Sequence, residues 1–146
     1  MLREEIIERN STNPLREKTF QLALRIIKLN QYLTIDKKEF ILSKQVLRSG
    51  TNPGAMVREA INAESGSDFI HKLSIALKET DETQYWLELL YMSNYLNDIE
   101  FESIHADTIE VAKILTASIR TKKKNLAIKV SSILILLTLF INYWLM

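Results

Sequence analysis

DFIHKLSIALKETDETQYWLELLYMSNYL, residues 68–96, carries the clearest helical pattern in the chain. Residues on one side of this segment recur at alternating spacings of four and three, which is the seam of a heptad repeat. Further apolar residues flank the seam and widen it to the buried face that a bundle helix needs. We therefore expect a helix packed against other helices. The seam comprises Phe69, Leu73, Ala76, Thr80, Thr83, Leu87, Leu90 and Asn94, with Ile70, Leu77 and Tyr91 beside it.

Another helix is predicted directly after this segment. Asn97 and Asp98 are typical of a turn, and the same spacing then continues to about Arg120. The residues expected to face the core are Phe101, Ile104, Thr108, Val111 and Leu115.

Two helices are predicted before residue 68. Asn13 followed by Pro14 is typical of an N-cap and first helical position, so a helix should run from there to about Tyr32. Asp36 and Glu39 form an acidic capping box that should start the next helix. The stripe that the first of these helices is expected to bury contains Phe20, Leu24 and Ile27.

The main cluster of helix-breaking residues is GTNPG, residues 50–54. A proline removes one backbone hydrogen bond and clashes with the carbonyl four residues back, so the helix must either stop near Thr51 or kink. Residues 55–63 are rich in good helix formers. We expect a kink, after which the helix resumes.

Length and composition support an all-α fold. The 146 residues suffice for one domain, and three Gly and two Pro are too few for a sandwich of many turns. The absence of cysteine excludes disulfides, thiolate catalysis and cysteine-ligated metals. We predict an antiparallel up-down four-helix bundle with an additional apolar C-terminal helix. The expected parts are an N-terminal extension (1–13), the bundle (14–121) and a basic, then apolar, tail (122–146).

Charge is distributed unevenly between the body and the tail. The whole chain has 19 basic and 18 acidic side chains, which is not the basic balance of a typical nucleic-acid binder. Residues 121–146 nevertheless hold four lysines and no acidic residue. Lys122, Lys123 and Lys124 precede an uncharged run that begins at Val130.

The tail has the length and flanks of a membrane anchor. A helix over residues 130–146 would be about 25 Å long, and one over 126–146 about 31 Å, against a hydrocarbon core of about 30 Å. Tyr143 and Trp144 stand where interfacial aromatic residues would lie, and the lysines predict a cytoplasmic bundle anchored to the inner membrane. The first residues contain no apolar core of signal-peptide length. A helix buried in an oligomer and an unselected extension remain the alternatives for the tail.

Metal and catalytic chemistry find little support in the sequence. Asp68-x-x-His71 and Glu102-x-x-His105 resemble half-sites of a di-iron bundle, but they should lie at opposite ends of the bundle. A shared metal within one chain is therefore excluded, and we expect both histidines at surfaces or interfaces, although a site between protomers stays open. We predict no catalytic residue, cofactor, metal or small-molecule substrate.

Tyr85 and Trp86 are two aromatic residues that lie off the heptad seam. Large amphipathic rings outside a core often anchor contacts between proteins. Tyr85 and Trp86 are thus candidate oligomer-interface residues. The alternative is that Trp86 only closes the edge of a wide buried stripe.

Several blocks of the chain resemble the four-helix bundle proteins encoded by intervening sequences of bacterial large-subunit ribosomal RNA genes. The blocks are QVLRSG (45–50), DFI (68–70) leading into KLSIALKE (72–79), and ETQYWL (82–87), within a resemblance that covers residues 14–120. It implies an antiparallel bundle that assembles into a homopentamer. A related branch, the accessory variability proteins of diversity-generating retroelements, partners a reverse transcriptase and binds nucleic acid. That branch is markedly basic, whereas the body of this chain is not.

The expected function is therefore a non-enzymatic, homo-oligomeric interaction or scaffold module, tethered to a membrane by its tail. The alternative is an adaptor for RNA or a nucleoprotein, in which basic residues contact phosphates. The same side chains are candidates for phosphate or lipid headgroup contacts in the two hypotheses: Arg120, Lys122, Lys123 and Lys124.

Overall fold

The computed structural model describes residues 1–144, and the side chains of residues 1–142. The helices are α1 (Leu2–Ser11), α2 (Pro14–Ile35), α3 (Leu42–Ile61), α4 (Gly66–Met92) and α5 (Asp98–Trp144). The described residues form no strand. The prediction of an all-α fold is confirmed.

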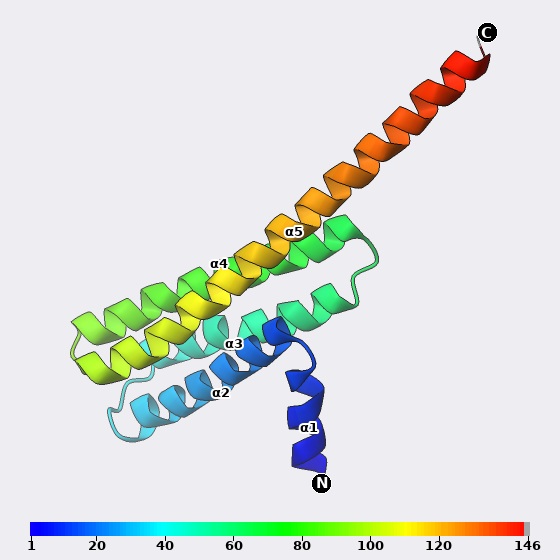
Figure 1. Cartoon of the computed structure of the whole chain (residues 1–146). Helices are drawn as coiled ribbons and strands as arrows, with labels where there is room; N and C mark the ends of the chain where they lie inside the picture. The colour runs from blue at the N-terminus through cyan, green and yellow to red at the C-terminus, as the bar shows by residue number, and fades with distance from the viewer. Residues whose placement is uncertain (145–146) are drawn as a thin grey trace.

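Four helices lie side by side, and each runs opposite to the one before it in the chain (Figure 1). α2 packs on α3, α3 on α4 and α4 on α5, and α5 in turn contacts α2. The second half of α5 projects beyond these helices, and α1 stands at the start of α2 (Figure 1).

The heptad seam of α4 is the centre of the core. Its residues from Leu73 to Leu90 are buried, as are the α5 residues Ile104, Thr108, Val111 and Leu115. Asn94 differs from the prediction, because α4 ends at Met92 and Asn94 lies in the following turn with a φ of 62°. Asparagine tolerates this left-handed conformation better than most residues and so ends the helix.

The stripe predicted for α2 is wrong. Leu24 and Ile27 are exposed, and Phe20 is only half-buried. The predicted stripe and the stripe that is actually buried both have helical spacing, so the sequence pattern alone does not distinguish them. Packing against α3 and α5 decides which one is buried. The buried α2 residues are Leu15, Thr19, Leu22, Ile26, Leu29 and Leu33.

Side-chain caps start α2 and α3. Asn13 Oδ1 accepts hydrogen bonds from the backbone N of Leu15 (2.9 Å) and Arg16 (3.3 Å), as expected. At α3 the capping group is the Glu39 carboxylate alone, since Asp36 is the C-cap of α2.

Glu39 is buried, with 7% of the residue exposed, and accepts hydrogen bonds from three backbone N–H groups. Burial by itself would raise the pKa of Glu39, but the N–H groups of Leu42, Ser43 and Ile41 outweigh it and lower the pKa. The ionised carboxylate therefore stabilises the start of α3.

The α3 helix continues through Pro53 and does not stop near Thr51. Gly50, three residues earlier, is buried against Ile26 of α2. A Cβ at Gly50 would lie 2.7 Å from Ile26 Cγ1, whereas one at Gly54 would meet its nearest atom at 3.6 Å. The absence of a side chain at Gly50 therefore sets how closely α2 and α3 approach.

The sequence predicted an additional C-terminal helix. In the structure this segment is instead the continuation of α5. Residues 98–144 contain neither Gly nor Pro, so nothing interrupts the helix between bundle and tail. The packing also extends past the expected boundary at residue 121, because Leu126 lies against Gly66 at the start of α4.

The N-terminal extension contains a short helix that the sequence analysis missed. Asn10 of α1 is buried, and its Oδ1 accepts a hydrogen bond from Arg58 Nη2 of α3 (3.1 Å). Because this contact is made by two polar side chains, the sequence of α1 shows no periodic apolar face, and the helix was therefore not predicted.

Gly50→Ala should destabilise the protein by about 1–2 kcal/mol, because overpacking against Ile26 exceeds the helix propensity gained. Gly54→Ala is the matched control in the same helix and should be neutral or stabilising by up to about 1 kcal/mol. Urea unfolding of both variants measures the difference. Equal effects of the two substitutions would contradict a close approach at Gly50.

Glu39→Gln should lower stability by about 1–2 kcal/mol near neutral pH, because a neutral amide with one acceptor oxygen replaces the capping carboxylate. Since folding lowers the pKa of Glu39, its stabilisation is complete above the pKa of the unfolded chain and is lost as the pH falls through the lowered value.

The stabilities of the wild type and the Glu39→Gln variant should therefore converge as the pH falls through the lowered pKa of Glu39. Asp36→Asn is the control and should change stability by less than about 0.5 kcal/mol. A stability difference that does not depend on pH would contradict the role of the charged carboxylate.

Candidate functional site

The candidate site lies on α5, where the helix leaves the bundle (Figure 1). Three of its four expected basic residues, Arg120, Lys123 and Lys124, are exposed. Lys122 differs, because it is half-buried and its Nζ lies 5.2 Å from the centroid of the Phe69 ring of α4. We name Arg120, Lys122, Lys123 and Lys124 the basic collar.

From Val130 onward, α5 carries no charged side chain and is mostly apolar. An 18-residue window reaches a mean hydropathy of 1.8, and none of it is buried. Leu136 and Phe140 are 66% and 64% exposed. By length and composition this helix could cross a membrane. The expected interfacial aromatic side chains of Tyr143 and Trp144, and residues 145–146, lie outside the described side chains.

Tyr85 and Trp86 occupy different environments on α4. Tyr85 is 52% exposed, and the two rings meet edge to face with centroids 5.0 Å apart. Trp86 is half-buried against the core, and its Nε1 donates to Glu82 Oε1 (3.1 Å). Tyr85 is therefore accessible to a partner, whereas Trp86 also closes the edge of the bundle.

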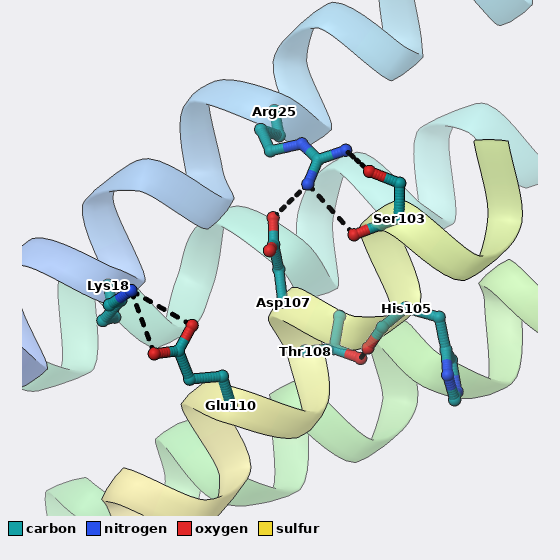
Figure 2. A network of polar contacts seen from close by, with 7 residues as sticks. All are labelled: Lys18, Arg25, Ser103, His105, Asp107, Thr108 and Glu110. Carbon is teal, nitrogen blue, oxygen red and sulfur yellow. Dashed lines mark hydrogen bonds and ion pairs between the residues drawn. The ribbon is translucent and has the colours of Figure 1, made fainter. Parts of the chain in front are cut away.

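A polar network joins α2 to α5 and was not foreseen from the sequence. Lys18 Nζ lies 2.9 Å from Glu110 Oε1, and Arg25 pairs with Asp107 and donates to Ser103 Oγ (2.9 Å) (Figure 2). The hydrogen bond to Glu110, and the charge of that carboxylate, raise the pKa of Lys18. Both cations of α2 are therefore paired with carboxylates of α5.

The two histidines lie far apart along the bundle. His71 is exposed near the start of α4, while His105 lies early in α5 and points away from the α2–α5 network (Figure 2). His105 Nε2 is 3.9 Å from Glu88 Oε1. Among the described residues no group of three or more His, Asp or Glu side chains is placed to hold a metal ion.

The carboxylates of α4 do not gather into a reactive cluster. Glu82 pairs with Arg48 of α3 (2.6 Å). Glu79 is buried, and its Oε2 has no hydrogen-bond partner among the described residues.

A hollow of about 510 Å³ lies at the α4–α5 turn. Tyr91 lines it and donates a hydrogen bond to Asp98 Oδ1 (3.0 Å), which raises the pKa of Tyr91. Tyr91 is thereby kept protonated, as a donor rather than a base. The remaining lining comprises Tyr32, Lys37, Met92, Asn94, Tyr95, Leu96, Asn97, Asp98 and Glu100.

Comparison with known proteins identifies the family. The model of the family described as 23S rRNA-intervening sequence protein matches residues 12–117. The chain belongs to this family. The match ends before the basic collar and the apolar part of α5, so the family relationship covers the bundle and not the candidate membrane segment.

A solved relative supports the same assignment. It is a protein of unknown function from the S23 ribosomal protein family of Bacteroides thetaiotaomicron, and it is 48% identical to this chain. The alignment covers 73% of this chain and 95% of the relative, with a TM-score of 0.72. No curated protein matches the chain. Neither the family model nor the solved relative indicates a family of enzymes.

Proposed function

We propose that this chain is a non-enzymatic, homo-oligomeric helical interaction module, with its bundle on the cytoplasmic side of a membrane and α5 as its anchor. The observation that carries the proposal is the uncharged part of α5 that begins at Val130, which is exposed on all sides over its described side chains. An apolar helix without a partner in the chain needs a different apolar environment.

The energy of insertion favours the bilayer. Leu, Ile, Phe and Val each contribute roughly −0.3 to −0.6 kcal/mol at the centre of a membrane helix, so nine such residues supply several kcal/mol. Ser131, Ser132 and Thr138 oppose insertion weakly, and the hydroxyls of Ser132 and Thr138 hydrogen-bond to carbonyls of their own helix. The residues that favour insertion are Val130, Ile133, Leu134, Ile135, Leu136, Leu137, Leu139, Phe140 and Ile141.

The basic collar supports the orientation. Arg120, Lys123 and Lys124 are exposed next to the apolar run, and no acidic residue follows Arg120. Lysines and arginines beside a span favour the cytoplasmic side and interact with anionic lipids. The bundle would then remain in the cytoplasm.

Assembly with other copies is the second part of the proposal. The resemblance to pentameric bundle proteins suggests it, and the exposed ring of Tyr85 offers a contact outside the core. A bundle already closed by four helices leaves its surfaces, rather than a central chamber, for interaction.

An adaptor for RNA or a nucleoprotein is the alternative. It is favoured by the exposed cations of the basic collar, which could contact phosphates. Lysines that lie against anionic lipid are less available to nucleic acid, so the two functions compete for the same side chains. Binding to RNA that weakens steeply with salt, without binding to vesicles, would favour this alternative.

The membrane proposal predicts that the full chain stays with membranes after a carbonate wash. Leu136→Arg places a charge near the centre of residues 126–146 and should weaken insertion by roughly 2.5–3.5 kcal/mol. Ile128→Arg is the matched control near the interface and should be retained. Both positions are exposed, so neither substitution disturbs the core. Release of the wild type by carbonate would contradict anchoring.

Tyr85→Ala should reduce the assembly size in light scattering while leaving helicity unchanged, because the ring is exposed. Trp86→Ala should reduce assembly and also lower the melting temperature, because its ring packs on the core. Phe40→Ala removes a ring that is also exposed and serves as control. An oligomer that survives both α4 substitutions would reject this interface.

A further inference from the structure

Two contacts join the start of α4 to α5 just before the apolar run. Leu126 Cδ2 lies only 2.8 Å from the position that a Cβ on Gly66 would occupy. One helical turn earlier, Lys122 Nζ lies 5.2 Å from the centroid of the Phe69 ring. The first turn of α4 therefore lies level with residues 122–126 of α5.

Because α5 is continuous, these contacts fix how far the start of α4 lies from the apolar run of α5, and so from the membrane. Val130 follows Leu126 by four residues, which is about 6 Å along a helix. The polar layer on each side of the hydrocarbon core is roughly 5–8 Å thick. If hydrocarbon begins at Val130, the start of α4 lies within or at the outer edge of the headgroup layer. If Lys129 snorkels and hydrocarbon begins at Leu126, the start of α4 lies at the hydrocarbon edge.

The exposed groups at this end of the bundle include polar, aliphatic, basic and acidic side chains. Ile61, the last residue of α3, is 46% exposed, and Ser65 and Ser67 are exposed beside it in the chain. Lys123 and Lys124 are exposed at the same level of α5. Glu64, exposed in the α3–α4 connection, and Asp68, half-buried in the first turn of α4, add two carboxylates at this end. The four cations of the basic collar outnumber these two carboxylates, so the net charge still suits the phosphates of an anionic lipid surface.

We propose that the α3–α4 connection and the first turn of α4 lie in the headgroup layer of an anionic membrane, so that the bundle stands upright on an unbroken α5. This inference rests on the membrane anchoring proposed above and goes beyond it by assigning a second lipid contact, made by the bundle. The opposite end, at the α4–α5 turn, then lies about 40 Å away, because α4 is 27 residues long.

Single-cysteine labelling of the full chain tests the inference, because the chain has no cysteine of its own. Ser67→Cys and Ser93→Cys are matched exposed positions at the two ends of α4. Ser132→Cys lies in the apolar run and reports insertion. Each variant carries an environment-sensitive fluorophore and is added to phosphatidylcholine–phosphatidylglycerol vesicles that contain a lipid with a nitroxide on its headgroup.

The expected result is that the label at residue 132 shifts to the blue, and that headgroup nitroxides quench the label at residue 67 several-fold more than the label at residue 93. A blue shift at residue 132 with equal quenching at residues 67 and 93 overturns the inference and leaves the anchor standing. A label at residue 132 that stays in an aqueous environment overturns the anchor, and the inference with it.

Asn125→Pro tests whether the continuous helix sets the height. Asn125 is exposed and outside the core, and proline at this position breaks the helix between the Lys122 and Leu126 contacts, just before the span. Quenching at residue 67 should then fall toward that at residue 93, while the label at residue 132 stays inserted. Unchanged quenching at residue 67 would show that α5 does not hold the bundle upright.

Discussion

One helix in this protein, α5, is buried along its first half and exposed along its second half. Over its first half, α5 buries one stripe, including Val111 and Leu115, against the other helices. Over its second half the described side chains from Val130 onward are exposed on all sides. Since residues 98–144 contain neither Gly nor Pro, both halves share one helical axis. The position of the bundle relative to whatever surrounds the apolar half follows from this constraint.

The bundle itself is held by the heptad seam of α4, which lies between α3 and α5. Two threonines in this seam, Thr80 and Thr83, are buried, but each hydroxyl donates to a carbonyl four residues back. Thr83 Oγ1 also contacts Ser49 Oγ of α3 (3.1 Å). The hydroxyls of these threonines therefore have their hydrogen bonds made inside the core, as buried polar groups require.

The sequence predicted the structure correctly where a pattern was compatible with only one arrangement. Heptad spacing identified the buried faces of α4 and α5, and Asn13–Pro14 located the start of α2. It was insufficient in α2, where two apolar stripes have helical spacing and only the neighbouring helices choose between them. It also missed the α2–α5 ion pairs and the buried Asn10, because polar contacts between distant residues have no period. At the candidate site, the basic residues were found from local charge, whereas the packing of Lys122 on Phe69 needed the fold.

The central claim is that α5 runs unbroken from the core of the bundle into a membrane. Amide hydrogen exchange of the full chain, with and without anionic vesicles, tests it most directly, because exchange reports hydrogen bonding and solvent access along every turn. The account predicts that vesicles slow exchange strongly from residue 130 onward and that residues 121–126 remain protected as a helix. Fast exchange at residues 121–126, or an exchange rate in the apolar segment that vesicles do not change, would contradict it.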